Sequence, residues 1–207
     1  GTLSFTPRVK YPVPIAEGVA GVVGNKVIVV GGVTNKEGGG FRTVQEAYFL
    51  DTGKDEREWA WEALPWMEAT GNKTWEDYLW PIEKKARGRA YAVAGARSDQ
   101  FYIFGGRDYA VSTDPAPERV HQEKLDILSD CYMLRWEGPK PVWKRLADLP
   151  RGMSAAPSAA LPVGVSHLLM VGGVSAQYWR QQFEDRPDLN GAGDLHPGFE
   201  RSVWAYD

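Results

Sequence analysis

Three long loops of this 207-residue chain carry the side chains that could do chemistry: residues 33–44, 107–130 and 174–201. Each loop contributes an arginine, Arg42, Arg107 or Arg180, and a planar guanidinium can bind a carboxylate through two parallel hydrogen bonds. The third loop adds amides that can bind hydroxyl groups and rings against which a sugar can pack: Gln177, Gln181, Gln182, Tyr178 and Trp179. The loops therefore predict a site for a small, polar, acidic ligand.

Carboxylates in the same loops are candidates for proton transfer, namely Glu37, Glu184 and Glu200. The candidate substrate-binding residues are Arg107, Gln177, Tyr178, Arg180, Gln182, Glu184 and Arg201. The alternative interpretation is that these charged side chains are solvated, as most are on surface loops.

A metal or phosphate site is not expected. His121 and His196 have no ligand partners at metal-binding spacing, and Cys131 is the only cysteine, so the chain has no CxxC pair. The Gly38-Gly39-Gly40 run lacks the Lys-Ser/Thr pair and the helix that follow a phosphate-binding loop. We expect no cofactor.

The bulk composition limits the class of partner. The net charge of −3 provides no basic surface for a nucleic acid backbone. We find no run of 18 apolar residues and no signal-peptide pattern, so no membrane span is predicted. The sequence leaves the compartment open.

Each loop follows a glycine pair that ends a short hydrophobic run: Gly31-Gly32, Gly105-Gly106 and Gly172-Gly173. The pairs lie 74 and 67 residues apart, which indicates an internal repeat with insertions. Short runs of β-branched and aromatic residues flank each pair and predict four strands per unit, with the third unit ending after three. Because the loops occupy the same point of each unit, we expect them to converge.

The units resemble the kelch family, in which a Tyr or Trp near an Asp, and then a Trp before Leu-Pro, follow the glycine pair. Tyr48 with Asp51, Trp143 with Leu149-Pro150, and Trp204 with Asp207 match this pattern. The resemblance implies an all-β propeller of four-stranded antiparallel blades. Trp59, Trp61, Trp143 and Trp204 would then pack neighbouring sheets rather than bind a ligand.

We assign the blades to residues 14–66, 67–150 (with an insertion) and 151–207 (lacking the last strand), and residues 1–13 to an outer closing strand. Propellers typically have about 4–8 blades, and this chain has three. It is therefore either half of a six-bladed ring completed by a second chain, or a fragment whose remaining blades lie elsewhere.

Within the kelch proteins, the first unit is similar to the bacterial N-acetylneuraminate mutarotases. Gly18-Val-Ala-Gly21, Gly31-Gly32 and Phe41-Arg42-Thr43 occur in the order found in that group, and Gly88-Arg-Ala-Tyr91 resembles another of its blades. The resemblance implies an isomerase that interconverts the anomers of free sialic acid, in a periplasmic or secreted protein.

The same resemblance implies the catalytic residues. Arg42 matches the family's arginine, whereas the family's glutamate directly follows the glycine pair, where this chain has Val33. Glu37 lies nearby and is the candidate replacement. Two alternatives stay open. Val33 favours a non-catalytic glycan-binding propeller, and the polar and aromatic residues of the third loop are compatible with a kelch module that binds a protein partner.

Overall fold

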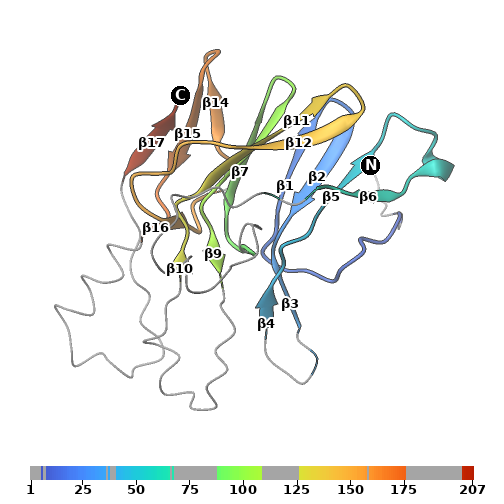
Figure 1. Cartoon of the computed structure of the whole chain (residues 1–207), viewed down its shortest axis with the longest axis horizontal. Helices are drawn as coiled ribbons and strands as arrows, with labels where there is room; N and C mark the ends of the chain where they lie inside the picture. The colour runs from blue at the N-terminus through green and yellow to red at the C-terminus, as the bar shows by residue number, and fades with distance from the viewer. Residues whose placement is uncertain are drawn as a thin grey trace, which may run out of the picture.

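The computed structural model is an all-β chain (Figure 1), described for residues 6, 8–35, 37, 41–65, 67, 88–108, 126–157, 159–175 and 202–207. The expectation of an all-β fold is confirmed. The described residues contain no α-helix and one 3-10 turn, η1 (Glu56–Glu58). No helix in these ranges is long and apolar enough to cross a bilayer.

Three antiparallel sheets make up the body of the chain and lie side by side (Figure 1). The first sheet has the order β1-β2-β5-β6, with strands Val19–Val23, Lys26–Val30, Ala47–Asp51 and Trp61–Ala63. The second has the order β7-β8-β11-β12, with strands Val93–Arg97, Gln100–Phe104, Cys131–Glu137 and Lys140–Arg145. The third has the order β14-β15-β17, with strands Leu161–Val163, His167–Val171 and Val203–Tyr206.

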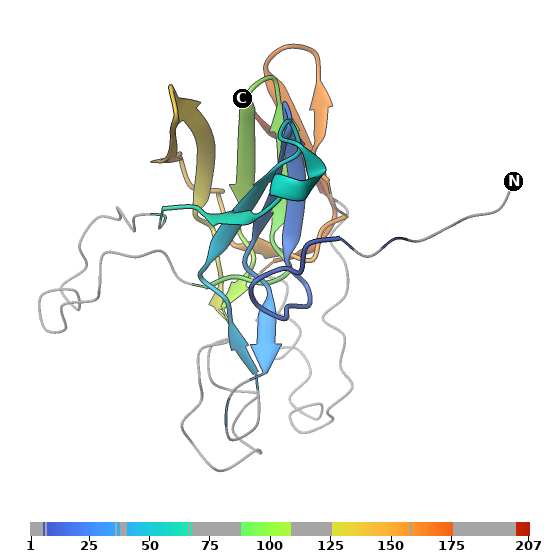
Figure 2. The ribbon, with the colours of Figure 1, turned by 90° about the vertical axis from the view of Figure 1, so that its right-hand side faces the viewer.

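Three short strand pairs continue the main sheets at one common end (Figures 1 and 2). They are β3–β4 (Val33–Asn35 with Phe41–Thr43), β9–β10 (Arg107–Asp108 with Asp126–Ile127) and β13–β16 (Met153–Ser154 with Val174–Ser175). The strand that directly follows each glycine pair (β3, β9 or β16) therefore lies at the same end of the molecule. The described ends of the three loops thus lie at one end of the molecule, as expected from the sequence.

The three sheets are built in the same way. The first glycine of each pair donates its backbone N–H to the residue that precedes the next long strand: Gly31 to Glu46 (3.2 Å), Gly105 to Asp130 (3.0 Å) and Gly172 to Ser202 (2.9 Å). Corresponding residues Glu17, Tyr91 and Ala155 all have left-handed backbones, with φ of 58°, 52° and 54°. Such a conformation is uncommon for residues with a side chain, so its recurrence shows a real structural repeat.

Two apolar cores hold the sheets together face to face. Ile28, Val30 and Phe49 of the first sheet meet Phe101 and Ile103 of the second. The opposite face of the second sheet packs on the third in the same way, through residues that include Tyr102, Phe104, Leu168 and Met170. Alternate residues of β8 thus serve the two interfaces, as the twofold alternation of a strand requires.

Tryptophans lie at the edges of these cores, as expected for Trp143 and Trp204, whereas Trp59 and Trp61, for which the same role was expected, belong to neither core. Trp143 packs against the first core and donates its indole N–H to the Pro65 carbonyl at 3.0 Å. Trp136 makes an edge contact with Phe49, with ring centroids 5.5 Å apart. Trp204 packs against the second core. These rings bridge sheets instead of lining a ligand site.

Of the expected closing strand over residues 1–13, only Thr6 and residues 8–13 are described, and they form no strand. Tyr11 instead lies against Tyr48 and Trp61 of the first sheet, with ring centroids 5.4 and 4.9 Å away. The closing strand and the blade boundaries stay predictions, and so does the arrangement of the sheets as propeller blades.

Backbone hydrogen bonds cross from each sheet to the next. Gly32 donates to the Arg89 carbonyl and Gly106 to the Met153 carbonyl, both at 2.8 Å. The approach is so close that a Cβ on Gly31 would lie 2.2 Å from the Arg89 oxygen. Only glycine fits there, for its missing side chain as well as for its φ of 67°.

We predict that Gly31→Ala lowers the free energy of unfolding by about 3 kcal/mol or more. The added methyl group would collide with the Arg89 carbonyl, which its hydrogen bond from Gly32 holds in place. Gly24→Ala is the matched control, since Gly24 has a φ of 55° but a Cβ added there would meet nothing within 4 Å. Gly24→Ala should lower the free energy of unfolding by only about 1–2 kcal/mol, the cost of placing a side chain on a left-handed backbone. Urea titrations measure both, and equal losses would contradict the proposed collision.

Candidate functional site

A row of polar side chains connects the three short strand pairs. The Thr43 hydroxyl on β4 donates to the Asp108 carboxylate on β9 at 2.5 Å. On the same strand, Arg107 Nε donates to the Ser154 hydroxyl on β13 at 3.1 Å. Neighbouring residues of β9 therefore bind the preceding and the following pair. We call Thr43, Asp108, Arg107 and Ser154 the polar row.

Arg107 has the most ordered surroundings of the expected site residues that are described. Its backbone N–H and C=O both bond to Ala90, at 2.7 and 2.8 Å. Its guanidinium carbon lies 5.8 Å from the centre of the Tyr91 ring. The Ser154 hydroxyl is fully buried and anchors Nε. Arg107 thus presents a cation held by backbone, hydroxyl and aromatic ring together.

Arg42 follows a different pattern. It lies next to Thr43 on β4, so the two side chains project to opposite faces of the strand. Its side chain is about two-fifths exposed, and a loose ion pair places Nη1 3.9 Å from Glu46 Oε2. Such a pair contributes little to stability, which leaves Arg42 able to exchange Glu46 for another carboxylate.

Glu37, the second expected catalytic residue, is exposed in the turn between β3 and β4. The two strands place it on the same short pair as Arg42. Among the described residues, Glu37 has no hydrogen bond or ion pair with Arg42. Its expected role stays a prediction.

The remaining expected substrate-binding residues lie outside the described residues: Gln177, Tyr178, Arg180, Gln182, Glu184 and Arg201. The structure adds three that the sequence analysis did not single out, Thr43, Asp108 and Ser154. A signal for Asp108 was present, because it directly follows Arg107 at the start of the second loop. Thr43 and Ser154 carry no such signal, since hydroxyl residues are common in strands and turns.

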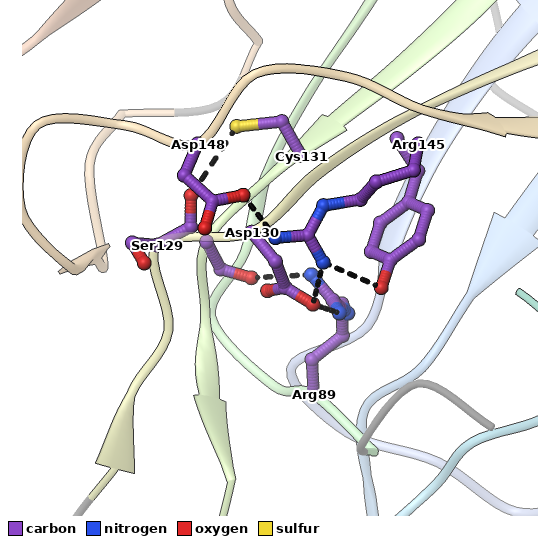
Figure 3. A network of polar contacts seen from close by, with 8 residues as sticks. Arg89, Ser129, Asp130, Cys131, Arg145 and Asp148 are labelled. Carbon is purple, nitrogen blue, oxygen red and sulfur yellow. Dashed lines mark hydrogen bonds and ion pairs between the residues drawn. The ribbon is translucent and has the colours of Figure 1, made fainter. Parts of the chain in front are cut away.

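A second polar cluster, also missed, centres on the buried Arg89 (Figure 3). Arg89 is 1% exposed and donates from Nη1 to the Gly105 carbonyl at 2.9 Å and from Nη2 to Asp130 at 2.7 Å. Arg145 points at the same carboxylate, with Nη1 3.6 Å away, and donates to the Tyr132 hydroxyl at 3.1 Å. Arg145 also forms an ion pair, through Nη2, with the half-exposed side chain of Asp148.

The electrostatics of this cluster are those of a structural ion pair. Burial works against the charge of Asp130, but the charges and hydrogen bonds of Arg89, Arg145 and Tyr132 outweigh it and hold its pKa below the usual value. Burial raises the pKa of the Tyr132 hydroxyl to about 12. Burial likewise raises the pKa of the Cys131 thiol to about 12, which rules out a reactive thiolate near neutral pH.

Comparing the repeats could have revealed Arg89. It holds the position of Ile15 in the first repeat and Met153 in the third, each one residue before a strand bridge. A charge at a position that is otherwise apolar needs a buried partner, and Asp130 is the residue that supplies it. Within the described ranges, no three His, Cys, Asp or Glu side chains come together as metal ligands.

We predict that Asp130→Asn lowers the free energy of unfolding at pH 7 by about 3 kcal/mol, because it leaves the Arg89 charge buried without a counter-ion. The folded pKa of Asp130 is depressed, so its stabilisation is present above the unfolded value of about 3.9 and is lost as the pH falls through the folded value. The difference between wild type and variant should therefore shrink below about pH 4.

Asp148→Asn is the control. Because the Asp148 carboxylate is half exposed, its replacement should lower the free energy of unfolding by about 1 kcal/mol or less. Chemical denaturation between pH 3 and 7 measures these effects. A penalty for Asp130→Asn that stays constant down to pH 3 would show that its charge is not what matters.

No protein-family model matches the sequence, and no curated protein matches it either. The site must therefore be interpreted from its own chemistry.

Proposed function

We propose that the chain forms three blades of a kelch-type β-propeller that binds a small acidic sugar and interconverts its anomers, as the N-acetylneuraminate mutarotases do. The observation that carries the proposal is the polar row, with Arg107 ordered within it and Arg42 beside it at one end of the sheets.

The repeated construction supports the propeller. Three sheets of four, four and three strands follow one another with the same face-to-face packing. The innermost strands are successive, since β1 contacts β7 and β7 contacts β14. A continuous line of backbone bonds joins Glu17 to Tyr91 and Tyr91 to Ala155, at 3.0 and 2.8 Å. An arrangement of this kind extends by adding further sheets around an axis.

The chemistry needs few groups. A base takes the proton of the anomeric hydroxyl, the bond between the anomeric carbon and the ring oxygen breaks, and that oxygen receives a proton. Reclosure on the other face of the resulting carbonyl reverses the steps and yields the opposite anomer. Arginine holds the carboxylate of the sugar through all of this, so that the reacting carbon stays near the base.

In this chain, Arg107 suits the positioning role because its orientation is set by Ser154 and Tyr91. Arg42 suits direct binding because its partner Glu46 is loosely held. Glu37 is the proposed base, on the turn of the strand pair that carries Arg42. General-base catalysis of this type typically contributes about 10²–10⁴-fold.

A second candidate is a propeller that binds an acidic glycan without catalysis. Val33 at the position that follows the glycine pair favours it, because a valine cannot transfer a proton. The exposed position of Glu37, without a contact to Arg42 in the described residues, favours it also.

We expect the protein to accelerate the equilibration of N-acetylneuraminate from the α to the β anomer, followed by NMR after enzymatic release of the α form. Arg42→Gln should reduce the acceleration at least about tenfold, which corresponds to about 1.4 kcal/mol of transition-state binding. Glu37→Gln should reduce it by about 10²-fold or more. Arg57→Gln, in the exposed η1 turn, is the matched control and should leave it unchanged.

Calorimetry with the same sugar separates the two candidates. Binding without acceleration would replace the mutarotase by the glycan-binding module. An absence of both binding and acceleration would overturn both.

A further inference from the structure

The contact between Thr43 and Asp108 lies between the first two short strand pairs and is rigid on its Thr43 side. Thr43 is 9% exposed, and Gly88 packs against it so closely that a Cβ added to Gly88 would lie 2.9 Å from Thr43 Cβ. Val44, the next residue, is fully buried, and its backbone N–H and C=O are both hydrogen-bonded. The Thr43 hydroxyl is therefore a fixed donor, 2.5 Å from Asp108 Oδ1.

The Asp108 carboxylate is half-buried, and its surroundings do not neutralise it. In the part of the chain that the structure describes, it accepts one hydrogen bond, from the neutral Thr43 hydroxyl to Oδ1. The register places a second acidic residue, Asp126, opposite Asp108, and like charges in register destabilise a strand pair. Asp130, in contrast, is paired with two arginines. A contribution to stability therefore does not account for the charge of Asp108.

The repeat shows that the fold does not require an acid at this position. Asp108 is the second residue after its glycine pair, and the corresponding residues are Thr34 in the first unit and Ser175 in the third. All three residues lie in the short strand that follows the glycine pair. An uncharged hydroxyl residue is therefore sufficient in the other two units, and the carboxylate is particular to the second.

The repeat gives the same result for the Thr43 hydroxyl. Thr43 pairs with Val33 directly after the first glycine pair, as Ile127 pairs with Arg107 after the second, so Ile127 is the counterpart of Thr43. The neighbouring glycine is repeated too, since a Cβ on Gly152 would lie 2.2 Å from the Ile127 oxygen. The close packing is thus common to both units, whereas the contact between a hydroxyl and a carboxylate belongs to one gap alone.

We propose that Asp108, oriented by Thr43, is a ligand-binding residue that accepts a hydrogen bond from a hydroxyl group of an acidic sugar. Arg107 precedes Asp108 and Arg42 precedes Thr43, so a cation that can bind a carboxylate adjoins each member of the pair. The inference rests on the acidic-sugar site proposed above but not on catalysis.

The charges at this place select the kind of ligand. Asp108 repels the carboxylate of a ligand, so the group that meets it must be a hydrogen-bond donor. A hydroxyl group can donate to Asp108 while the ligand carboxylate binds an arginine. The class of ligand is therefore a carboxylic acid that carries hydroxyl groups, and an acid of similar size without them lacks the contact with Asp108.

Calorimetry with two acids tests the proposal, N-acetylneuraminate and cyclohexanecarboxylate, a ring-bearing acid without hydroxyl groups. The wild-type protein should bind the sugar more tightly. Asp108→Thr, which introduces the residue type of Thr34, should reduce this preference about 10–100-fold, because it removes a hydrogen bond to a charged acceptor. Asp99→Asn is the control, since it removes one negative charge from the exposed turn between β7 and β8 and should leave the preference unchanged.

Two further variants and one further measurement distinguish binding from a structural role. Thr43→Ser keeps the hydroxyl and should keep the affinity for the sugar, whereas Thr43→Val removes it and should weaken binding several-fold. The urea midpoint of Asp108→Thr should be equal to that of the wild type or above it, because the other units fold with a hydroxyl residue at this position.

Several results would overturn the proposal: a wild-type protein that does not bind the sugar, an unchanged preference in Asp108→Thr, or a urea midpoint of that variant well below the wild type. Sugar binding that is abolished by EDTA would also overturn it, since a divalent cation would then be the partner of Asp108. Binding that depends on Asp108 without faster equilibration of the anomers would support it and remove the mutarotase. Faster equilibration with an unchanged preference in Asp108→Thr would do the reverse.

Discussion

The structure depends on one contact, the hydrogen bond from the second glycine of a pair to a carbonyl at the inner end of the next sheet. Gly32 and Gly106 make this bond with the same length. It brings two backbones so close that no side chain fits at the preceding glycine. Buried amides and carbonyls need partners, and for the first two sheets the next sheet supplies the carbonyl. Packing of the apolar faces follows from this alignment.

Arg89 shows how one position combines structure and charge. Its carbonyl receives the bond from Gly32, while its side chain crosses to the Gly105 carbonyl and to Asp130. The residue therefore contacts both glycine pairs that flank it. An apolar side chain is sufficient at this position in the other repeats, as Ile15 and Met153 show. The extra contacts of Arg89 hold the segment that leads to Tyr91, against which Arg107 lies.

The sequence predicted the repeat, the all-β class and the strand content of the three sheets, because glycine pairs and apolar alternation are local signals. The packing role of Trp143 and Trp204 came from the kelch resemblance instead. It did not predict the polar row, because the partners Thr43 and Asp108 lie 65 residues apart and Arg107 and Ser154 lie 47 apart. Their meeting is decided by the packing of sheets. The same is true of Arg89 and Asp130, which lie 41 residues apart and carry no local signal that would pair them.

The polar row and the inter-sheet glycine contacts lie at the same end of the sheets, and this has a physical reason. The glycine pair ends a strand of the main sheet and begins a short strand pair, so any side chain one or two residues farther along is placed by the inter-sheet bonds. Arg107 and Asp108 directly follow Gly105-Gly106, so the backbone hydrogen bonds of that turn fix their positions. Arg42 lies farther from its glycine pair, and within the described residues its one ion pair is the loose contact with Glu46. In the proposed function, Arg107 therefore positions the ligand, and Arg42 adapts to it as the sugar changes its ring form.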